Sequence, residues 1–231
     1  MIINNIIDPL FANDPEMEDM STGSNKYRVF YRSHLDDQGR LTRDEIVDLI
    51  KAEFPNRQFQ NCLEWSAGVG FMGFDLLDHG VCQHLHLIEK YAPAVESATK
   101  TIDTNSLGSK ATCQLADSIT GISPRQFDLI VASPPQFKTF ALYNSSFGEY
   151  ALENWYDANC ERMCVDTDWQ EHVDFFAHCL DYLTNDGVIV LVEHESHIAE
   201  IETMVTAGLT GRRLSSSMIP GKLTYLILTR T

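Results

Sequence analysis

Positive charge is scarce in this chain. Its 231 residues include 17 Lys and Arg against 33 Asp and Glu, which gives a formal net charge of −16. A surface this acidic repels phosphate backbones at long range. The longest basic run is the pair Arg212-Arg213. Nucleic acid is therefore a disfavoured partner, although a local basic patch can override the average charge.

Long apolar runs and patterned cysteines are also missing. No stretch approaches the roughly 20 residues of a membrane-spanning helix, so no membrane contact is expected. Residues 1–20 hold five acids and no Lys or Arg, whereas a secretory signal starts with basic residues. The cysteines follow neither a zinc-ligand nor a disulfide spacing; they stand at positions 62, 82, 113, 160, 164 and 179. Reduced, buried thiols in a cytoplasmic protein are expected.

What the chain does contain is a regular alternation of strands and helices after residue 58. We expect strands at 59–64, 84–88, 111–115, 127–132 and 187–193. Helices are expected between them at 71–78, 92–103, 169–183 and 196–207. A closing pair of strands at 212–219 and 222–229 flanks Pro220-Gly221. The pattern predicts an α/β fold: a seven-stranded, mainly parallel sheet with helices on both faces and a C-terminal antiparallel hairpin.

A smaller N-terminal part precedes this unit. Residues 1–26 are polar and rich in turn residues, which indicates an extended arm or a partly ordered segment, and residues 27–31 alternate like a short strand. Thr42 and Glu45 have the spacing of a capping box, which predicts the start of a helix that stops at Pro55. We therefore expect an N-terminal arm and cap helix over 1–58 and the α/β domain over 59–231.

Acidic residues stand at the ends of three successive strands. Glu64 ends the first and is followed by the small-residue loop 66–70, where Gly68 and Gly70 let the backbone approach a ligand. This is not the dinucleotide fingerprint. Glu89 ends the second strand and can accept hydrogen bonds from ribose hydroxyls, and Asp117 after the third could bind an adenine amino group. The three acids point to an adenosine ligand without a phosphate.

With these residues, the chain resembles the class I S-adenosylmethionine-dependent methyltransferases over roughly residues 59 to 230. The resemblance implies a Rossmann-like fold and S-adenosylmethionine as the cofactor. It also implies that the first acid and the loop hold the methionine part, the second acid holds the ribose and the third contacts adenine. Ser66 stands where the family often has glycine. The expected cofactor-binding residues are Glu64, Ser66, Ala67, Gly68, Gly70, Glu89, Lys90, Asp117, Ser118 and Ser133.

A second loop, Ser133-Pro134-Pro135-Gln136-Phe137, follows the fourth strand. Two prolines fix the backbone and remove two N–H donors, so carbonyls and the Ser133 hydroxyl can hold an NH₂ group with its lone pair directed at a methyl sulfonium. The loop resembles the (Asn/Asp/Ser)-Pro-Pro-(Tyr/Phe/Trp) motif of methyltransferases that act on amino or amide nitrogens. Gln136 occupies the aromatic position, so either Phe137 turns to the target or the target is not a flat ring. The expected catalytic residues are Ser133, Pro134, Pro135 and Phe137.

The insertion over 137–169 is rich in rings and poor in positive charge. Only Lys138 and Arg162 are basic, and the aromatic residues are Phe137, Phe140, Tyr143, Phe147, Tyr150, Trp155, Tyr156 and Trp169. Rings without interleaved basic residues suit a lid over a small or peptide substrate better than a nucleic-acid groove. The other interpretation is a small subdomain packed on the sheet.

The sequence therefore favours an S-adenosylmethionine-dependent N-methyltransferase that acts on a protein side chain, with a glutamine amide as the natural fit, or on a small molecule. One alternative is a nucleobase amino-methyltransferase acting on RNA or DNA, at adenine N6 or cytosine N4. Another is a cofactor-binding partner subunit without catalysis. No metal is expected, because His172 and His178 lie off a common helix face, and His194 and His197 fit solvated strand-end residues better than ligands. The oligomeric state is left open.

Overall fold

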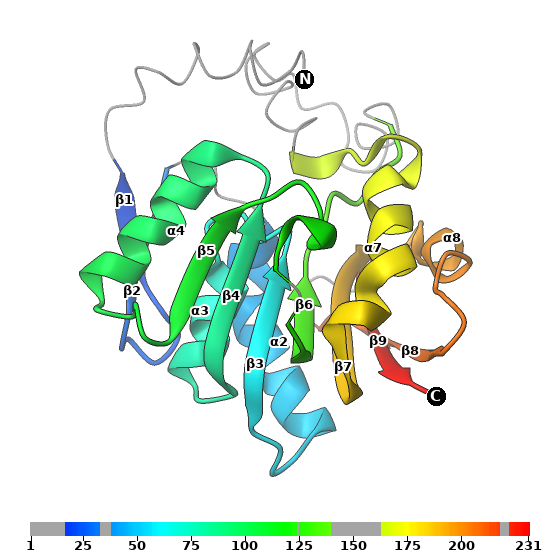
Figure 1. The fold of residues 1–231 in the computed structure, drawn as a ribbon, viewed down its shortest axis with the longest axis horizontal. Helices are drawn as coiled ribbons and strands as arrows, with labels where there is room; N and C mark the ends of the chain where they lie inside the picture. The colour runs from blue at the N-terminus through cyan, green and yellow to red at the C-terminus, as the bar shows by residue number, and fades with distance from the viewer. Residues whose placement is uncertain (1–16, 33–37, 124, 140–162, 218–221) are drawn as a thin grey trace.

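The computed structural model describes residues 17–32, 38–123, 125–139, 163–217 and 222–231. Its central sheet contains β3 (Phe59–Trp65), β4 (Cys82–Glu89), β5 (Ala111–Leu115), β6 (Phe127–Ala132), β7 (Leu183–His194), β8 (Leu209–Ser215) and β9 (Leu223–Arg230). The strand order is β5-β4-β3-β6-β7-β9-β8 (Figure 1). β9 runs antiparallel to β7 and β8, and the other pairs are parallel. The predicted seven-stranded sheet and antiparallel C-terminal hairpin are confirmed.

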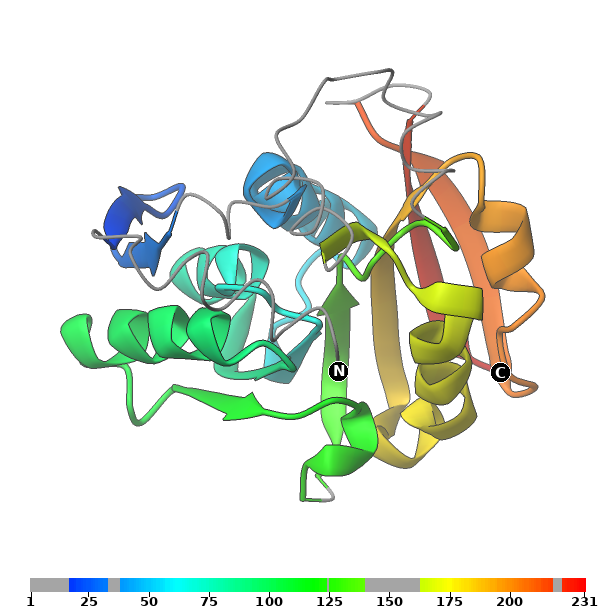
Figure 2. The same cartoon turned by 90° about the horizontal axis from the view of Figure 1, so that it is seen from above.

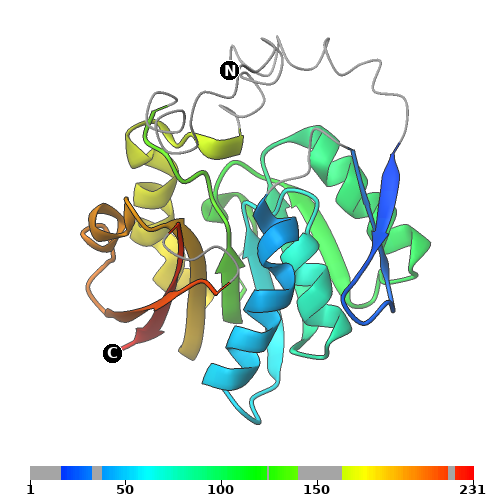
Figure 3. The same ribbon diagram turned by 180° about the vertical axis from the view of Figure 1, so that it is seen from behind.

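Helices cover both faces of this sheet. α2 (Gln38–Glu53), α3 (Phe71–Asp78) and α4 (Ala92–Thr104) pack on one face; α7 (Gln170–Tyr182) and α8 (Ile198–Glu202) pack on the other (Figures 1 and 3). Successive strand residues point to opposite faces, so Cys62 enters one apolar core and Leu63 the other. Each sheet face is thereby buried, as the continuous apolar strands require.

In the part of the chain that the structure describes, no helix has the length and apolar character needed to span a membrane.

The N-terminal part forms a separate hairpin rather than only one strand. β1 (Glu18–Ser21) pairs with β2 (Arg28–Tyr31) in an antiparallel register. The turn between them reaches α3, where Thr22 Oγ1 donates to Asp78 Oδ2 at 2.5 Å and the Gly23 amide donates to Asp75 Oδ1 at 2.7 Å. Asp75 therefore binds part of the hairpin and is 0% exposed. Within the predicted arm, residues 18–21 therefore form a strand of this hairpin.

The predicted capping box is also wrong. α2 begins at Gln38, so Thr42 and Glu45 lie inside the helix. Thr42 Oγ1 contacts the Met72 sulfur on α3 at 3.8 Å. Glu45 accepts hydrogen bonds from the Ser216 hydroxyl at 2.6 Å and from the Tyr225 hydroxyl at 2.8 Å. Both side chains bind residues of other elements. A local sequence pattern cannot distinguish such long-range contacts from helix capping.

The buried face of α7 is not set by its aliphatic residues alone. The apolar side chain of Val173 is 53% exposed. His172 and Phe175 are buried instead, beside Phe176 and Cys179. Hydrophobic periodicity counts a histidine as polar, and the burial of His172 depends on carboxylates from other parts of the chain. α8 is also shorter than the helix predicted at 196–207.

Candidate active site

The two predicted loops leave the sheet from adjacent strand tips. Trp65, the last residue of β3, pairs with Ala132, the last residue of β6. From β3 the chain continues to β4 on one side, whereas β6 lies on the other side, so the order of the strands reverses between β3 and β6. Parallel sheets bind ligands at the carboxyl ends of the strands at such a reversal. Figure 2 views the molecule from this side.

The loop after β3 is a tight turn with left-handed backbone at three positions. The φ angles are 53° at Ser66, 54° at Gly68 and 87° at Gly70. A Cβ on Gly70 would also lie 2.8 Å from the Phe74 ring, so both backbone and packing require glycine there. The Ala67 amide donates to the Ile88 carbonyl at 3.0 Å, which ties the loop to β4. A non-glycine residue with this conformation, such as Ser66, is strained and marks a constrained turn.

Glu64 holds the first turn of α3. Its side chain is buried, at 1% exposure, and Oε2 accepts a hydrogen bond from the Gly73 amide at 2.9 Å. A Cβ at Gly73 would lie 2.5 Å from the same oxygen. The carboxylate therefore requires glycine at that position and fixes the helix behind the loop. Its predicted contact with the methionine part of the cofactor stays a prediction.

Glu89 closes the glycine loop against β4. One carboxylate oxygen accepts from the Gly68 amide at 2.8 Å, and the other accepts from the Tyr91 amide at 2.8 Å. A carboxylate oxygen can accept two hydrogen bonds, so the same group can also bind a ribose diol. Next to it in the sheet, Leu115 pairs with Glu89 and is 55% exposed. This exposed apolar side chain beside a buried acid offers a surface for a flat base, and sequence reasoning did not identify it.

The remaining predicted cofactor residues lie close to these strand tips. Lys90 forms an ion pair with Glu171 of α7. Asp117 is exposed just beyond β5. Ser118 begins the short 3₁₀ helix η2 (Ile119–Gly121), where its Oγ accepts from the Thr120 amide at 3.0 Å. Lys90 therefore already has a protein partner. Among the described residues, no hydrogen bond fixes the side chain of Asp117.

Gln136 fixes the loop after β6 from its buried side. This side chain is 3% exposed, and its Nε2 donates to the Val192 carbonyl of β7 at 2.9 Å and to Ser133 Oγ at 3.4 Å. Pro134 and Pro135 are buried, whereas Ser133 is half-buried. Gln136 thus points beneath the loop and binds the residue that begins it. In the place where the related motif has an aromatic ring, the chain has a side chain that supports Ser133.

Phe137 packs in the interior, which corrects its predicted role as a ring for the acceptor. It is 0% exposed, and its ring centroid lies 5.0 Å from that of His194 and 5.4 Å from that of His197. The histidines predicted as solvated are thus partners of a buried ring, and His194 is 6% exposed. Burial is the main cause that lowers the pKa of both imidazoles. Among the smaller effects, Lys222 also lowers the pKa of His194, and Glu200 opposes the shift at His197.

Most of the aromatic insertion lies outside the described residues. Its members there include Phe140, Tyr143, Asn144, Phe147, Glu149, Tyr150, Asn154, Trp155 and Tyr156. The predicted lid stays a prediction. Of its described rings, Trp169 is buried at 1% exposure, as Phe137 is.

A group with metal-ligand chemistry lies elsewhere, on α3. Asp75, Asp78 and His79 have ligand atoms within 4.8 Å of one another. Arg43 Nε, however, lies 3.3 Å from Asp75 Oδ2, and the hairpin turn binds both carboxylates. A guanidinium already supplies the positive charge. Burial raises the pKa of Asp75 to about 6, against the opposing effects of the Gly23 amide and Arg43. We interpret the group as the docking point of the hairpin.

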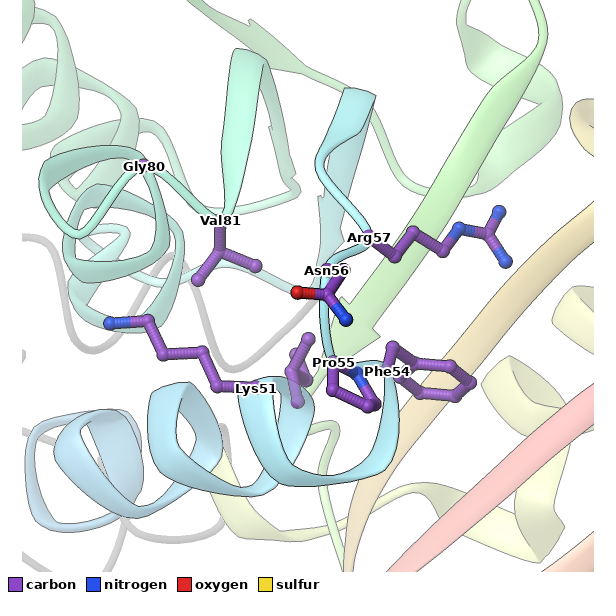
Figure 4. A pocket seen from close by; sticks show the side chains of 8 residues that line it. Lys51, Phe54, Pro55, Asn56, Arg57, Gly80 and Val81 are labelled. Atoms are coloured by element: carbon purple, nitrogen blue, oxygen red, sulfur yellow. The ribbon is translucent and has the colours of Figure 1, made fainter.

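A hollow of about 300 Å³ opens at the opposite end of the sheet (Figure 4). It lies between the C-terminal end of α2 and the starts of β3 and β4, and its lining includes Phe54, Pro55 and Val81. None of the predicted site residues contributes to it. The hollow is therefore separate from the two loops.

A model of the methyltransferase small domain family matches residues 27–145, just over half of the chain. A search of curated proteins gave no match.

Among solved structures, the chain is similar to the 16S rRNA N2 G1207 methyltransferase RsmC of Thermus thermophilus, solved with AdoMet and guanosine. The identity is 15% and the TM-score 0.59, over 94% of this chain and 50% of RsmC. It is similar to TrmN from Thermus thermophilus at 13% identity and a TM-score of 0.55, over 80% of this chain and 48% of TrmN. It is also similar to the ribosomal protein L11 methylase of Lactobacillus delbrueckii subsp. bulgaricus, with an identity of 11% and a TM-score of 0.57, over 82% of this chain and 79% of the methylase. The chain spans about half the length of RsmC and TrmN.

Proposed function

The chain belongs to the methyltransferase small domain family, and we propose that it methylates an amide or amino nitrogen of a protein side chain or of a small molecule. We propose S-adenosylmethionine as the methyl donor, and the methyltransferase family supports this choice. The nitrogen and the class of acceptor are further parts of the proposal. The observation that carries methyl transfer between the two loops is the pairing of Trp65 with Ala132, from which the glycine loop and the Ser133 loop start side by side.

The residues around the first loop fit an adenosine ligand that lacks a phosphate. Gly68 and Gly70 keep side chains out of the turn, and Glu89 offers a carboxylate anchored by two amides. We propose that Glu89 holds the ribose, that Leu115 packs on the adenine and that Asp117 binds its amino group. Glu64 acts from behind by fixing α3. When bound, S-adenosylmethionine supplies a methyl group on a sulfonium, an electrophilic carbon that needs only an aligned nucleophile.

The residues of the second loop position that nucleophile. Pro134 and Pro135 have no backbone N–H, so the loop offers oxygen atoms that accept hydrogen bonds. A nitrogen group of the methyl acceptor can donate its hydrogens to these oxygens. The Ser133 hydroxyl, held by Gln136, and a loop carbonyl would each accept one hydrogen from an NH₂ group. The lone pair of that nitrogen then points away from both oxygens, toward the neighbouring loop. Alignment of this kind is the main source of rate enhancement in a transfer that needs no strong base.

The choice of a protein or small-molecule acceptor is supported by charge and by the buried side chains of the motif. The net charge of −16 disfavours a phosphate backbone. Gln136 and Phe137 both point into the protein, so neither presents a ring on which a nucleobase would stack. The fold itself leaves the acceptor open, because it is shared by an rRNA methyltransferase and by a ribosomal protein methylase.

The Ser133→Ala variant tests the second loop. We expect turnover to fall about 10- to 100-fold, since one hydrogen bond that orients the nitrogen is lost. The dissociation constant of S-adenosylmethionine should change less than about twofold, because the carboxylate that binds its ribose is untouched. The Ser133→Thr variant keeps the hydroxyl and should retain most of the turnover. Equal turnover of the alanine variant and the unmodified protein would remove Ser133 from the mechanism.

The acceptor itself is tested by incubation with S-adenosylmethionine that carries a tritiated methyl group, in a fractionated cell extract. The proposal expects label in protein or in small metabolites. Label in RNA or DNA would replace it by the nucleobase alternative. Salt provides a second reading, because binding of a nucleic-acid acceptor falls steeply as the salt concentration rises.

A further inference from the structure

A buried charge cluster lies directly behind the reaction loop. His172, on α7, is 0% exposed, and both of its ring nitrogens face carboxylates that are 1% exposed. Nδ1 lies 2.6 Å from Asp166 Oδ2, and Nε2 lies 3.1 Å from Glu193 Oε1. A neutral imidazole carries one N–H and would place a lone pair against one of the two carboxylates. The imidazolium donates to both carboxylates, whereas a neutral ring would match them only if one of them carried a proton. Burial raises the pKa of Glu193 and the charge of His172 lowers it, so the geometry favours a protonated His172 between two carboxylates.

The surroundings of His172 favour that charge. Its ring lies edge-on to Trp65 and Trp169, with centroids at 5.8 and 5.2 Å, and the facing charged groups are Asp166 from the segment before α7 and Glu193 from β7. Glu171, which pairs with Lys90 from the tip of β4, is the next charge outward. Burial alone would lower the pKa of His172, but Glu193 and Asp166 outweigh it and raise the pKa to about 9.

Asp166 connects this cluster to the reaction loop. The Phe137 amide donates to the Cys164 carbonyl at 2.9 Å, and the Asp166 amide donates to the Phe137 carbonyl at 2.9 Å. Phe137 directly follows the Ser133–Gln136 segment. Asp166 also accepts from the amides of Glu171 and His172 at 3.0 and 3.1 Å, which fixes the first turn of α7. The end of the reaction loop, the start of α7 and His172 thus share one residue: the amide of Asp166 binds the loop, and its carboxylate binds the helix and the imidazole.

Glu193 connects the cluster to β7 at the place where Gln136 is bound. Gln136 donates to the carbonyl of Val192, the residue before Glu193. Glu193 is completely surrounded by protein, and its Oε2 has no hydrogen-bond partner among the described residues. Its buried charge therefore depends on His172, since an unpaired buried carboxylate is strongly unfavourable. The loop is thus linked to two adjacent residues of β7. Gln136 binds Val192, and the cluster of Asp166 and His172 binds Glu193.

We propose that His172 is a positioning residue: as an imidazolium between Asp166 and Glu193, it holds the Ser133–Phe137 loop against β7 beside the cofactor loop. It touches neither substrate nor cofactor, since it is fully buried. The inference rests on the proposed function, in that the loop it holds is the one assigned to the acceptor nitrogen. Because the pKa is raised from 6.5 to about 9, the stabilisation is complete below pH 6.5 and is lost as the pH rises through about 9.

The first test uses the unmodified protein, with its histidines labelled with ¹⁵N. The imidazole of His172 should be protonated at pH 7.5 and lose its proton near pH 9. Glu193→Gln should shift that loss to lower pH, because one of the two carboxylates that raise the pKa becomes neutral. A neutral His172 at pH 7.5 would overturn the proposal, and this result requires no variant to fold.

The second test follows amide hydrogen exchange. His172→Gln should speed exchange at the Phe137 and Asp166 amides about tenfold or more, since the tie that orders both is lost. The Gly73 amide, bound to Glu64 in the cofactor half of the site, is the internal control and should keep its rate. Unchanged exchange at Phe137 and Asp166 would refute the positioning role. Exchange involves no acceptor, so a failure of the proposed function, seen as full turnover in Ser133→Ala, is a separate outcome.

Discussion

Replacement of Glu89 by alanine is expected to abolish measurable S-adenosylmethionine binding. The carboxylate accepts hydrogen bonds from the amides of Gly68 and Tyr91, so its removal loosens the glycine loop. It also removes the proposed acceptor of the ribose hydroxyls. A hydrogen bond to a charged group contributes about 1.5–3 kcal/mol, and a factor of ten in affinity corresponds to about 1.4 kcal/mol. Loss of several such bonds should weaken binding by at least about a hundredfold.

Calorimetric titration with S-adenosylmethionine measures this effect. Asp186→Ala is the matched control, because Asp186 is an acid in the sheet whose side chain is 82% exposed and pairs only weakly with Arg57 at 3.4 Å. Its affinity should equal that of the unmodified protein. Gly68→Val should behave like Glu89→Ala, since a β-branched residue is strained at a φ of 54°. Normal affinity in both Glu89→Ala and Gly68→Val would refute the cofactor site.

Replacement of Gly73 by valine is expected to lower the free energy of unfolding by about 3 kcal/mol, at the upper end of the usual effect of overpacking. A Cβ at this position would lie 2.5 Å from Glu64 Oε2 and 2.7 Å from Leu85 Cδ1. Neither neighbour can move freely, because Glu64 is hydrogen-bonded to the same residue and Leu85 is buried in the core. The valine would therefore displace α3 from the tip of β3.

Urea unfolding followed by circular dichroism measures the loss. Gly108→Ala is the control, because a Cβ there would meet no atom within 4 Å. It should be neutral or slightly stabilising. If Gly73→Val and Gly108→Ala unfold at the same urea concentration, then Glu64 does not hold α3 in the way described.

The fold was largely predictable because its strands carry strong local patterns. β5 and β6 have the predicted bounds, and β6 is a continuous apolar run of the kind that is buried on both faces. The errors lie where tertiary contacts decide. Thr42 and Glu45 have the spacing of a helix cap but bind Met72 and Tyr225 instead, and no local pattern distinguishes the two uses.

The candidate site was predictable in its positions but less so in its contacts. Glu64 and Glu89 were identified as strand-end acids, but their hydrogen bonds to Gly73 and Gly68 depend on how the loop folds back. Gln136 stood out as a departure from a motif; only the structure places its side chain beneath Ser133. His172 was set aside as a metal ligand, and its role in the fold could not be predicted because its carboxylate partners lie 6 and 21 positions away in the sequence.

The measurement that tests the account most directly is the location of the transferred methyl group. The acceptor fraction would be treated with the purified protein and S-adenosylmethionine carrying a ¹³C methyl group, and the product examined by mass spectrometry and carbon NMR. We predict a methyl group on a side-chain amide or amino nitrogen of a protein, or on a nitrogen of a small metabolite. A methyl group on oxygen, sulfur or carbon would contradict the role of the Ser133 loop, and one on a nucleobase would contradict the proposed acceptor.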